Sequence, residues 1–228
     1  MTAGRGGPMQ EWRFLQLALV MTAWLLVAPH VQHRLLVQVL LQVFLLNTLL
    51  VTLWANPQWR RARRAVIGLW FVSVAGSLLA LVPLPPEWNR WAGTAETASV
   101  VPLLALLASG ILRFVFRERR LTSDGLFATV AVYVVIAVLF AQLYLLVLIW
   151  NPGSFNLPPL AGGEATTALE GTLVYFSVVT MATVGYGDIL PVSETARALT
   201  VIEAVVGQFY VAVIVAVFVS LYSAQRRA

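Results

Sequence analysis

Long apolar segments limit what this chain can fold into. Residues 125–150 contain no Asp, Glu, Lys or Arg, and a helix of about 20 apolar residues crosses the hydrocarbon core of a bilayer. The chain as a whole is 60% hydrophobic and only 11% charged, which ordinary soluble domains are not. We therefore predict an all-α integral membrane protein with six transmembrane helices. The predicted helices cover residues 12–29, 35–54, 65–84, 98–116, 125–150 and about 198–222.

A seventh apolar segment is too short to cross the membrane. The stretch "ALEGTLVYFSVVTMA" would be about 20 Å long as a helix, whereas the hydrocarbon core is about 30 Å thick. We interpret residues about 169–182 as a re-entrant half-helix. The outer connections "PLPPEWNRWAGTAETA" and "NPGSFNLPPLAGGEATT" are rich in Pro, Gly and Thr, so we expect irregular structure in both. Thr122, Ser123 and Asp124 are candidate caps for the fifth helix.

The arginines predict the orientation of the spans. If the N-terminus lies inside, twelve of the 15 basic residues fall in the cytoplasm, and only Arg34, Arg90 and Arg197 fall outside. Cytoplasmic loops are enriched in arginine, so we expect a multi-pass protein with both termini cytoplasmic. Because these arginines lie beside apolar spans, the net charge of +5 favours contact with lipid headgroups, anionic ones included, over a nucleic-acid partner. Short connections and all-arginine basic loops favour a prokaryotic plasma membrane.

The composition also excludes several kinds of chemistry. The chain has no cysteine, so disulfides, thiolate metal sites and a cysteine nucleophile are excluded. Apolar spans with short connections take up most of the 228 residues and leave little room for a soluble catalytic domain. We therefore expect no enzyme activity.

One short stretch between apolar segments does carry chemistry. Residues 183–188, "TVGYGD", lie at membrane depth, where irregular backbone survives only if it is buried in protein or lines water. Gly185 and Gly187 permit positive φ at every second position, which can aim successive carbonyls to the same side. A column of such carbonyls can replace the hydration shell of a cation. The sequence therefore predicts that this stretch lines an ion pathway.

The stretch "TVGYGD" resembles the selectivity filter of the tetrameric potassium channels. The order of elements is also similar, with a half-helix before the motif and a full span after it, over about residues 125–222. The resemblance implies that oxygens of Thr183, Val184, Gly185 and Tyr186 coordinate K⁺ ions in the filter, and it implies no organic cofactor. One filter copy cannot surround an ion, so we predict a homotetramer with cyclic symmetry.

The resemblance implies supporting roles around this filter. The Tyr186 side chain would point away from the ions and pack against Tyr175 and Phe176. Gly187 would complete the filter, and Asp188 would lie at its outer mouth. The tyrosine favours K⁺ over Na⁺, because less selective relatives often lack it.

The last span contains candidates for a gate. Gly207 matches a glycine that the family uses as a hinge, but a small residue there could equally allow close helix packing. Val211, Val215 and Val219 repeat at helical spacing and would form one stripe. If that stripe faces the axis, four copies make an apolar constriction; packing against lipid or another subunit is the alternative.

Glu203 is the only acid well inside a predicted span, which makes it a functional candidate. It stands one helical turn before Gly207. We favour a supporting role behind the half-helix, with the carboxyl hydrogen-bonded and protonated. Direct contact with ions is the alternative.

Two domains are predicted. Residues 1–124 form a four-helix transmembrane domain that resembles a voltage sensor but lacks its gating charges, because the basic residues of the fourth span cluster at the inner end. Residues 125–228 form the pore domain. We predict a channel that conducts K⁺ passively and is not voltage-gated; a weakly selective cation channel, or a non-conducting scaffold or sensor with the same fold, are the alternatives. The clustered residues are Arg113, Arg117, Arg119 and Arg120.

Overall fold

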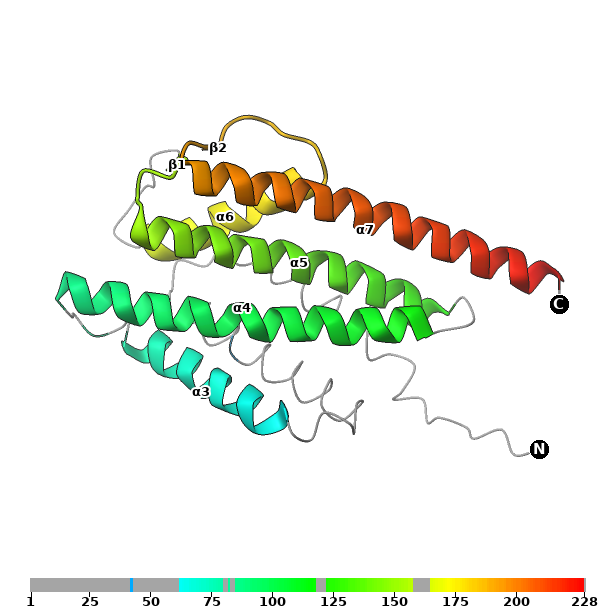
Figure 1. Cartoon of the computed structure of the whole chain (residues 1–228), viewed down its shortest axis with the longest axis horizontal. Helices are drawn as coiled ribbons and strands as arrows, with labels where there is room; N and C mark the ends of the chain where they lie inside the picture. The colour runs from blue at the N-terminus through cyan, green and yellow to red at the C-terminus, as the bar shows by residue number, and fades with distance from the viewer. Residues whose placement is uncertain are drawn as a thin grey trace.

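The computed structural model describes residues 42, 62–79, 82, 85–117, 122–157 and 165–227. These residues form long helices and one very small sheet (Figure 1). The helices are α3 (Ala62–Leu79), α4 (Pro86–Arg117), α5 (Ser123–Trp150), α6 (Ala165–Met181) and α7 (Glu194–Arg227), and the strands are β1 (Phe155–Asn156) and β2 (Leu190–Pro191).

Three helices of the described residues, α4, α5 and α7, are long and apolar enough to cross a membrane. They run side by side along the long axis of the molecule, with the shorter α6 near one end (Figure 1). The prediction of a helical membrane protein is confirmed. Apart from Gln42, the predicted spans at 12–29 and 35–54 lie outside the described residues, so the number of six spans stays a prediction.

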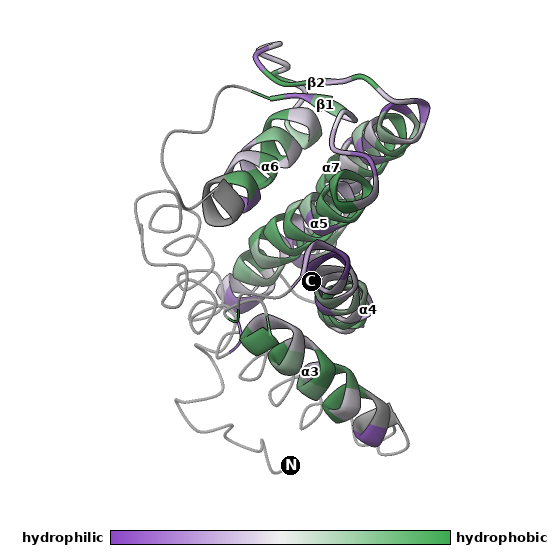
Figure 2. Cartoon of the chain, turned by 90° about the vertical axis from the view of Figure 1, so that its left-hand side faces the viewer, coloured by the Kyte–Doolittle hydropathy of each residue, from purple (hydrophilic) through white to green (hydrophobic). Residues whose placement is uncertain are grey.

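Helix α5 forms the centre of the packing. It begins where the sequence predicts, because the Thr122 hydroxyl accepts a hydrogen bond of 3.1 Å from the Gly125 N–H. It contacts α4, α6 and α7, and 61% of its most apolar stretch is buried, against 11% for α7. An 18-residue stretch of α7 is nevertheless strongly apolar, and Figure 2, which views the helices from one end, shows green hydrophobic residues on α7 as on α5. Most of the apolar surface of α7 is therefore left uncovered by this chain.

Helix α4 is longer than predicted. It begins at Pro86 instead of about residue 98, so most of the connection expected to be irregular is helical. Proline is tolerated in the first helical turn, where its missing N–H has no acceptor to lose. Contacts with α5 hold this extension. The Trp91 and Trp150 rings meet edge to face at 5.2 Å, and the Arg90 guanidinium lies 5.7 Å from the centre of the Trp150 ring.

The second connection expected to be irregular contains a strand. Phe155 pairs with Pro191 and Asn156 pairs with Leu190 in an antiparallel register, so the all-α prediction is wrong at this point. The pairing joins the segment after α5 to the segment before α7. It therefore closes the chain around α6 and the loop that follows it.

Other helix ends also differ from the prediction. Helix α3 is described as far as Leu79, and residue 82 lies in a bend, so the helix does not reach the predicted end at about residue 84. Helix α6 begins at Ala165, four residues early. Helix α7 begins at Glu194, where the Ser193 hydroxyl accepts a hydrogen bond from the Ala196 N–H, and it continues to Arg227.

Polar side chains connect α3 to α4. The Gln42 amide donates hydrogen bonds to Ser73 (2.7 Å) and Ser77 (3.1 Å), and the Ser77 hydroxyl donates to the Glu96 carboxyl. The two helices come very close at this level. A Cβ placed on Gly76 would lie 2.7 Å from the Cβ of Glu96.

Candidate ion-conduction site

The loop after α6 has an alternating backbone. Thr183, Gly185 and Gly187 have φ of 56°, 58° and 80°, so every second residue is left-handed. The prediction for the two glycines is confirmed. Thr183 was not predicted, because a positive φ is uncommon for residues other than glycine. Thr183, Gly185 and Gly187 occupy every second position, and this alternation was the sequence signal that could have predicted the positive φ of Thr183.

The end of α6 anchors this loop. The N–H of Thr183 donates to the carbonyl of Thr180 at 3.0 Å, and the N–H of Val184 donates to the carbonyl of Val179 at 3.0 Å. The first two backbone N–H groups of the loop therefore find their acceptors in the last turn of α6. The side chains of Val184 and Tyr186 remain 51% and 70% exposed in the single chain.

Tyr175 supports the loop from the side of α6. Its ring stacks on that of Tyr186, with centroids 6.4 Å apart and planes 3° from parallel. Its hydroxyl donates a hydrogen bond of 2.9 Å to the Asp188 carboxylate. One side chain of α6 thus contacts both the middle of the loop and its C-terminal end. The predicted contact between Tyr186 and Tyr175 is present.

Phe176 does not share this position, and the expectation that it packs against Tyr186 is wrong. Its ring lies edge to face with Tyr144 at 5.3 Å and with Phe155 at 5.5 Å. Successive residues of a helix point about 100° apart, so Tyr175 and Phe176 face different neighbours. Phe176 therefore connects α6 to α5 and to the strand pair.

The strand pair holds the returning end of the loop. The N–H of Val192 donates to the carbonyl of Ser154 at 2.8 Å, beside the pairing of β1 with β2. Ile189 and Phe155 are buried there. Sequence reasoning missed Phe155, because its aromatic neighbours come from two other elements.

Glu203 lies behind α6, on the side of α7 that faces the other helices. Its side chain is completely buried. The hydroxyls of Tyr144 on α5 and Ser177 on α6 both form hydrogen bonds with its carboxyl group. The expectation of a hydrogen-bonded residue behind the half-helix is confirmed in its geometry. Tyr144 and Ser177 themselves were missed.

Gly207 packs against the last residue of α6. A Cβ at this position would lie 3.0 Å from the carbonyl oxygen of Met181 and 3.1 Å from its Cα. Helix α7 runs through Gly207 without interruption. This contact favours close packing, the second of the two interpretations of this glycine.

The valine stripe is exposed in the single chain. Val211, Val215 and Val219 are 45%, 55% and 60% exposed. Neighbouring residues such as Val213 and Phe209 are also exposed, so the stripe is part of a broad apolar surface. The two interpretations of the stripe both remain.

The loop itself supplies the candidate ligands for an ion. In the part of the chain that the structure describes, no three His, Asp or Glu side chains come together as a metal site. The oxygens of Thr183, Val184, Gly185 and Tyr186 are candidate ligands, because backbone carbonyl oxygens suit unhydrated alkali ions. Nothing in this arrangement resembles a nucleophile with its base.

Comparison with known proteins identifies the class. A family model described as an ion channel matches residues 128–224, which include nearly all of α5, all of α6, the loop and most of α7. The chain is 31% identical to Protein LctB of Bacillus caldotenax over 96 residues, which cover 42% of this chain and 71% of that protein. It is 67% identical to the voltage-gated potassium channel Kch of Escherichia coli strain K12 over 30 residues, which cover 13% of this chain but only 7% of Kch.

These matches define an ion channel domain in a helical membrane protein. The chain belongs to the potassium channel family, as the resemblance of its loop predicted.

Proposed function

We propose that this protein is a potassium-selective channel that conducts K⁺ passively through oxygens of Thr183, Val184, Gly185 and Tyr186. The observation that carries the proposal is the alternating backbone of the loop, with positive φ at every second residue. That conformation can turn successive carbonyls toward one path, where they replace the hydration shell of an ion. The stacking of Tyr186 on Tyr175 supports a loop of fixed width.

The functional unit is a homotetramer. A single chain supplies only one wall of an ion path, and a closed ring of identical copies surrounds an ion symmetrically. The broad apolar surface of α7 supports this proposal, because Val201 and Phe209 are 63% and 68% exposed in the single chain. Neighbouring copies and lipid would cover them. Native mass spectrometry should give four times the chain mass of 25.0 kDa; a dimer would contradict the proposal.

The channel is not gated by voltage. A voltage sensor needs several charges within the membrane field. Helix α4 contains no basic residue between Arg90 at one end and Arg113 at the other. Conductance should therefore change little when the membrane potential is stepped, and a steep dependence on voltage would contradict this proposal.

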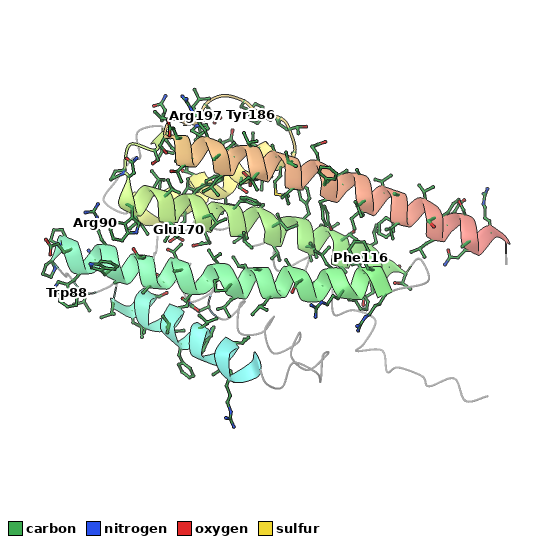
Figure 3. The ribbon with its side chains drawn as sticks, in the orientation of Figure 1. Trp88, Arg90, Phe116, Glu170, Tyr186 and Arg197 are labelled. Atoms are coloured by element: carbon green, nitrogen blue, oxygen red, sulfur yellow. The ribbon has the colours of Figure 1, made fainter. Side chains whose placement is uncertain are left out.

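The arginines support an orientation in a plasma membrane with both termini cytoplasmic. Arg113 and Arg117 belong to the C-terminal end of α4, and this end of the helix lies at the same end of the molecule as the C-terminus of α7 (Figure 1). Arg90, Arg197 and Tyr186 lie toward the opposite end (Figure 3). This distribution agrees with the enrichment of arginine on cytoplasmic surfaces. Anionic lipid headgroups on that side would contact Arg113 and Arg117.

The experiment that tests the proposal is a reversal potential in planar bilayers, with K⁺ on one side and Na⁺ on the other. We expect a value near the potassium equilibrium potential. Gly185→Ala should abolish selective conduction, because alanine disfavours a φ of 58°, whereas Gly68→Ala, in open space on α3, is the matched control. A reversal potential near zero would favour a weakly selective cation channel. No current from well-folded tetramers would favour a scaffold.

A further inference from the structure

The buried contacts of Glu203 contain more hydrogen-bond acceptors than hydroxyl hydrogens. The Ser177 hydroxyl lies 2.7 Å from the carbonyl oxygen of Ala137 on α5 and also contacts the Glu203 carboxyl. A serine hydroxyl has one hydrogen, and a carbonyl oxygen can only accept. If that hydrogen is donated to Ala137, the contact between Ser177 and Glu203 needs a hydrogen from the carboxyl group.

A carboxylic acid at Glu203 completes the arrangement. With this acid, the carboxyl group would donate to Ser177 Oγ, the Ser177 hydroxyl would donate to the Ala137 carbonyl, and the Tyr144 hydroxyl would donate to the second carboxyl oxygen. Each polar atom then has a hydrogen-bond partner. If Glu203 were a carboxylate, the single hydroxyl hydrogen of Ser177 could serve only one of its two contacts. The other contact, with the Ala137 carbonyl or with the Glu203 carboxylate, would bring two oxygens together without a hydrogen between them.

The charged groups on the packed helices do not compensate a carboxylate here. Helix α5 has Asp124 as its single charged residue, at its far end, and the other titratable groups that it contributes are the Tyr133 and Tyr144 hydroxyls. Helix α6 has Glu170, about two turns before Ser177, and no arginine. A buried charge without an opposite charge is strongly unfavourable. On α7 the nearest cation is Arg197, which donates to the Pro191 carbonyl, and Glu194 lies at the start of the helix.

Glu203 and Gly207 contact successive turns of α6. Glu203 bonds to Ser177, and Gly207 packs on Met181, four residues further along each helix. Met181 ends α6 and immediately precedes the loop whose amides bond to that helix end. These two contacts therefore connect α7 to the end of α6 that precedes the loop.

We propose that Glu203 is a protonated acid that ties α7 to α5 and α6, and that loss of its proton releases α7 from α6 and stops conduction at the loop. The residue acts by positioning, because it touches no ion path, and this inference rests on the proposed channel function. It predicts a channel that closes in alkaline solution. Glutamine mimics the protonated acid, since its amide can donate to Ser177 and its oxygen can accept from Tyr144.

The test compares the wild-type chain with Glu203→Gln in liposomes, measuring K⁺ flux against pH. Wild-type flux should fall on the alkaline side by about tenfold per pH unit, as the protonated fraction falls, whereas the flux of Glu203→Gln should stay level. Glu87→Gln, which changes an exposed acid at the start of α4, is the matched control and should follow the wild type. Identical pH profiles for wild type and Glu203→Gln would overturn the proposal.

Infrared spectroscopy of the same samples separates this inference from the channel function. A protonated carboxylic acid gives a carbonyl band distinct from that of a carboxylate, and this band should be present at neutral pH and absent in Glu203→Gln. Ser177→Ala should shift the band, because the carboxylic acid of Glu203 loses its hydrogen-bond acceptor. This variant also tests the contact between Glu203 and α6 if Glu203→Gln does not fold. Absence of the band in the wild type would overturn the inference. The band without K⁺ flux in any variant would overturn the channel function and support the protonated tie.

Discussion

Gly207 on the last helix leaves no space for a side chain, since a Cβ there would lie 3.0 Å from the carbonyl oxygen of Met181. The backbone of α7 thus rests directly on the end of the helix that carries the candidate filter. The neighbour that would have to move is backbone, which cannot turn away as a flexible side chain could. This contact explains a glycine in the interior of an otherwise regular helix, where glycine is normally unfavourable.

Gly207→Ala should therefore destabilise the folded assembly by about 1–3 kcal/mol, as overpacking does in well-packed cores. Thermal unfolding of the detergent-solubilised protein measures this loss. Gly68→Ala on α3, where a Cβ would meet no atom within 4 Å, should leave stability unchanged or slightly raised. If Gly207→Ala unfolds like the wild type but changes the open probability, the hinge interpretation would be favoured over close packing.

Tyr175→Phe should loosen the end of the candidate filter that contains Asp188. The variant keeps the ring that stacks on Tyr186 but removes the hydroxyl that donates to Asp188 at 2.9 Å. We expect faster decay of the current during sustained conduction and a lower ratio of K⁺ to Na⁺ permeability, measured in bilayers.

Tyr222→Phe is the matched control for this substitution, because Tyr222 lies near the end of α7 and is 50% exposed. Its ring can still meet Arg226 after the change. Unaltered decay and selectivity in Tyr175→Phe would show that the hydrogen bond to Asp188 does not stabilise the filter.

Phe155→Ala should separate the strand pair from the helices. The Phe155 ring meets Tyr144 at 5.2 Å and Phe176 at 5.5 Å, and it is 5% exposed. Removing a buried phenylalanine side chain destabilises proteins by about 3–5 kcal/mol. We expect a lower unfolding temperature, together with faster cleavage near the loop in limited proteolysis. Phe71→Ala, at a side chain that is 60% exposed, should cause neither change; equal effects of the two substitutions would refute the role of the cluster.

Gly76→Val should disturb the contact between α3 and α4 without changing ion selectivity. Its Cβ would meet that of Glu96 at 2.7 Å, in the layer where Ser77 donates to the Glu96 carboxyl. The candidate filter belongs to other helices, so the reversal potential with K⁺ and Na⁺ should stay at the wild-type value while the unfolding temperature falls. A shifted reversal potential would mean that the contact between α3 and α4 influences the candidate filter directly.

Local patterns in the sequence determined the features that depend on a single segment. The apolar segments indicated the membrane helices, Thr122 indicated the start of α5, and two glycines at alternate positions indicated the left-handed turns of the loop. A single acid in an apolar span marked Glu203 as a special residue. Each of these follows from the preferences of a residue and its immediate neighbours, which need no knowledge of the rest of the chain.

Only the tertiary structure decided which distant residues meet. Glu203 finds Tyr144 59 residues away and Ser177 26 residues away, and neither could be chosen from the many hydroxyls of the sequence. The extension of α4 depends on contacts with Trp150, and the strand pair depends on two loops that meet across α6. Helix rotation and interhelical packing set such contacts, because they satisfy buried polar groups and fill volume between elements, and no local pattern records either requirement.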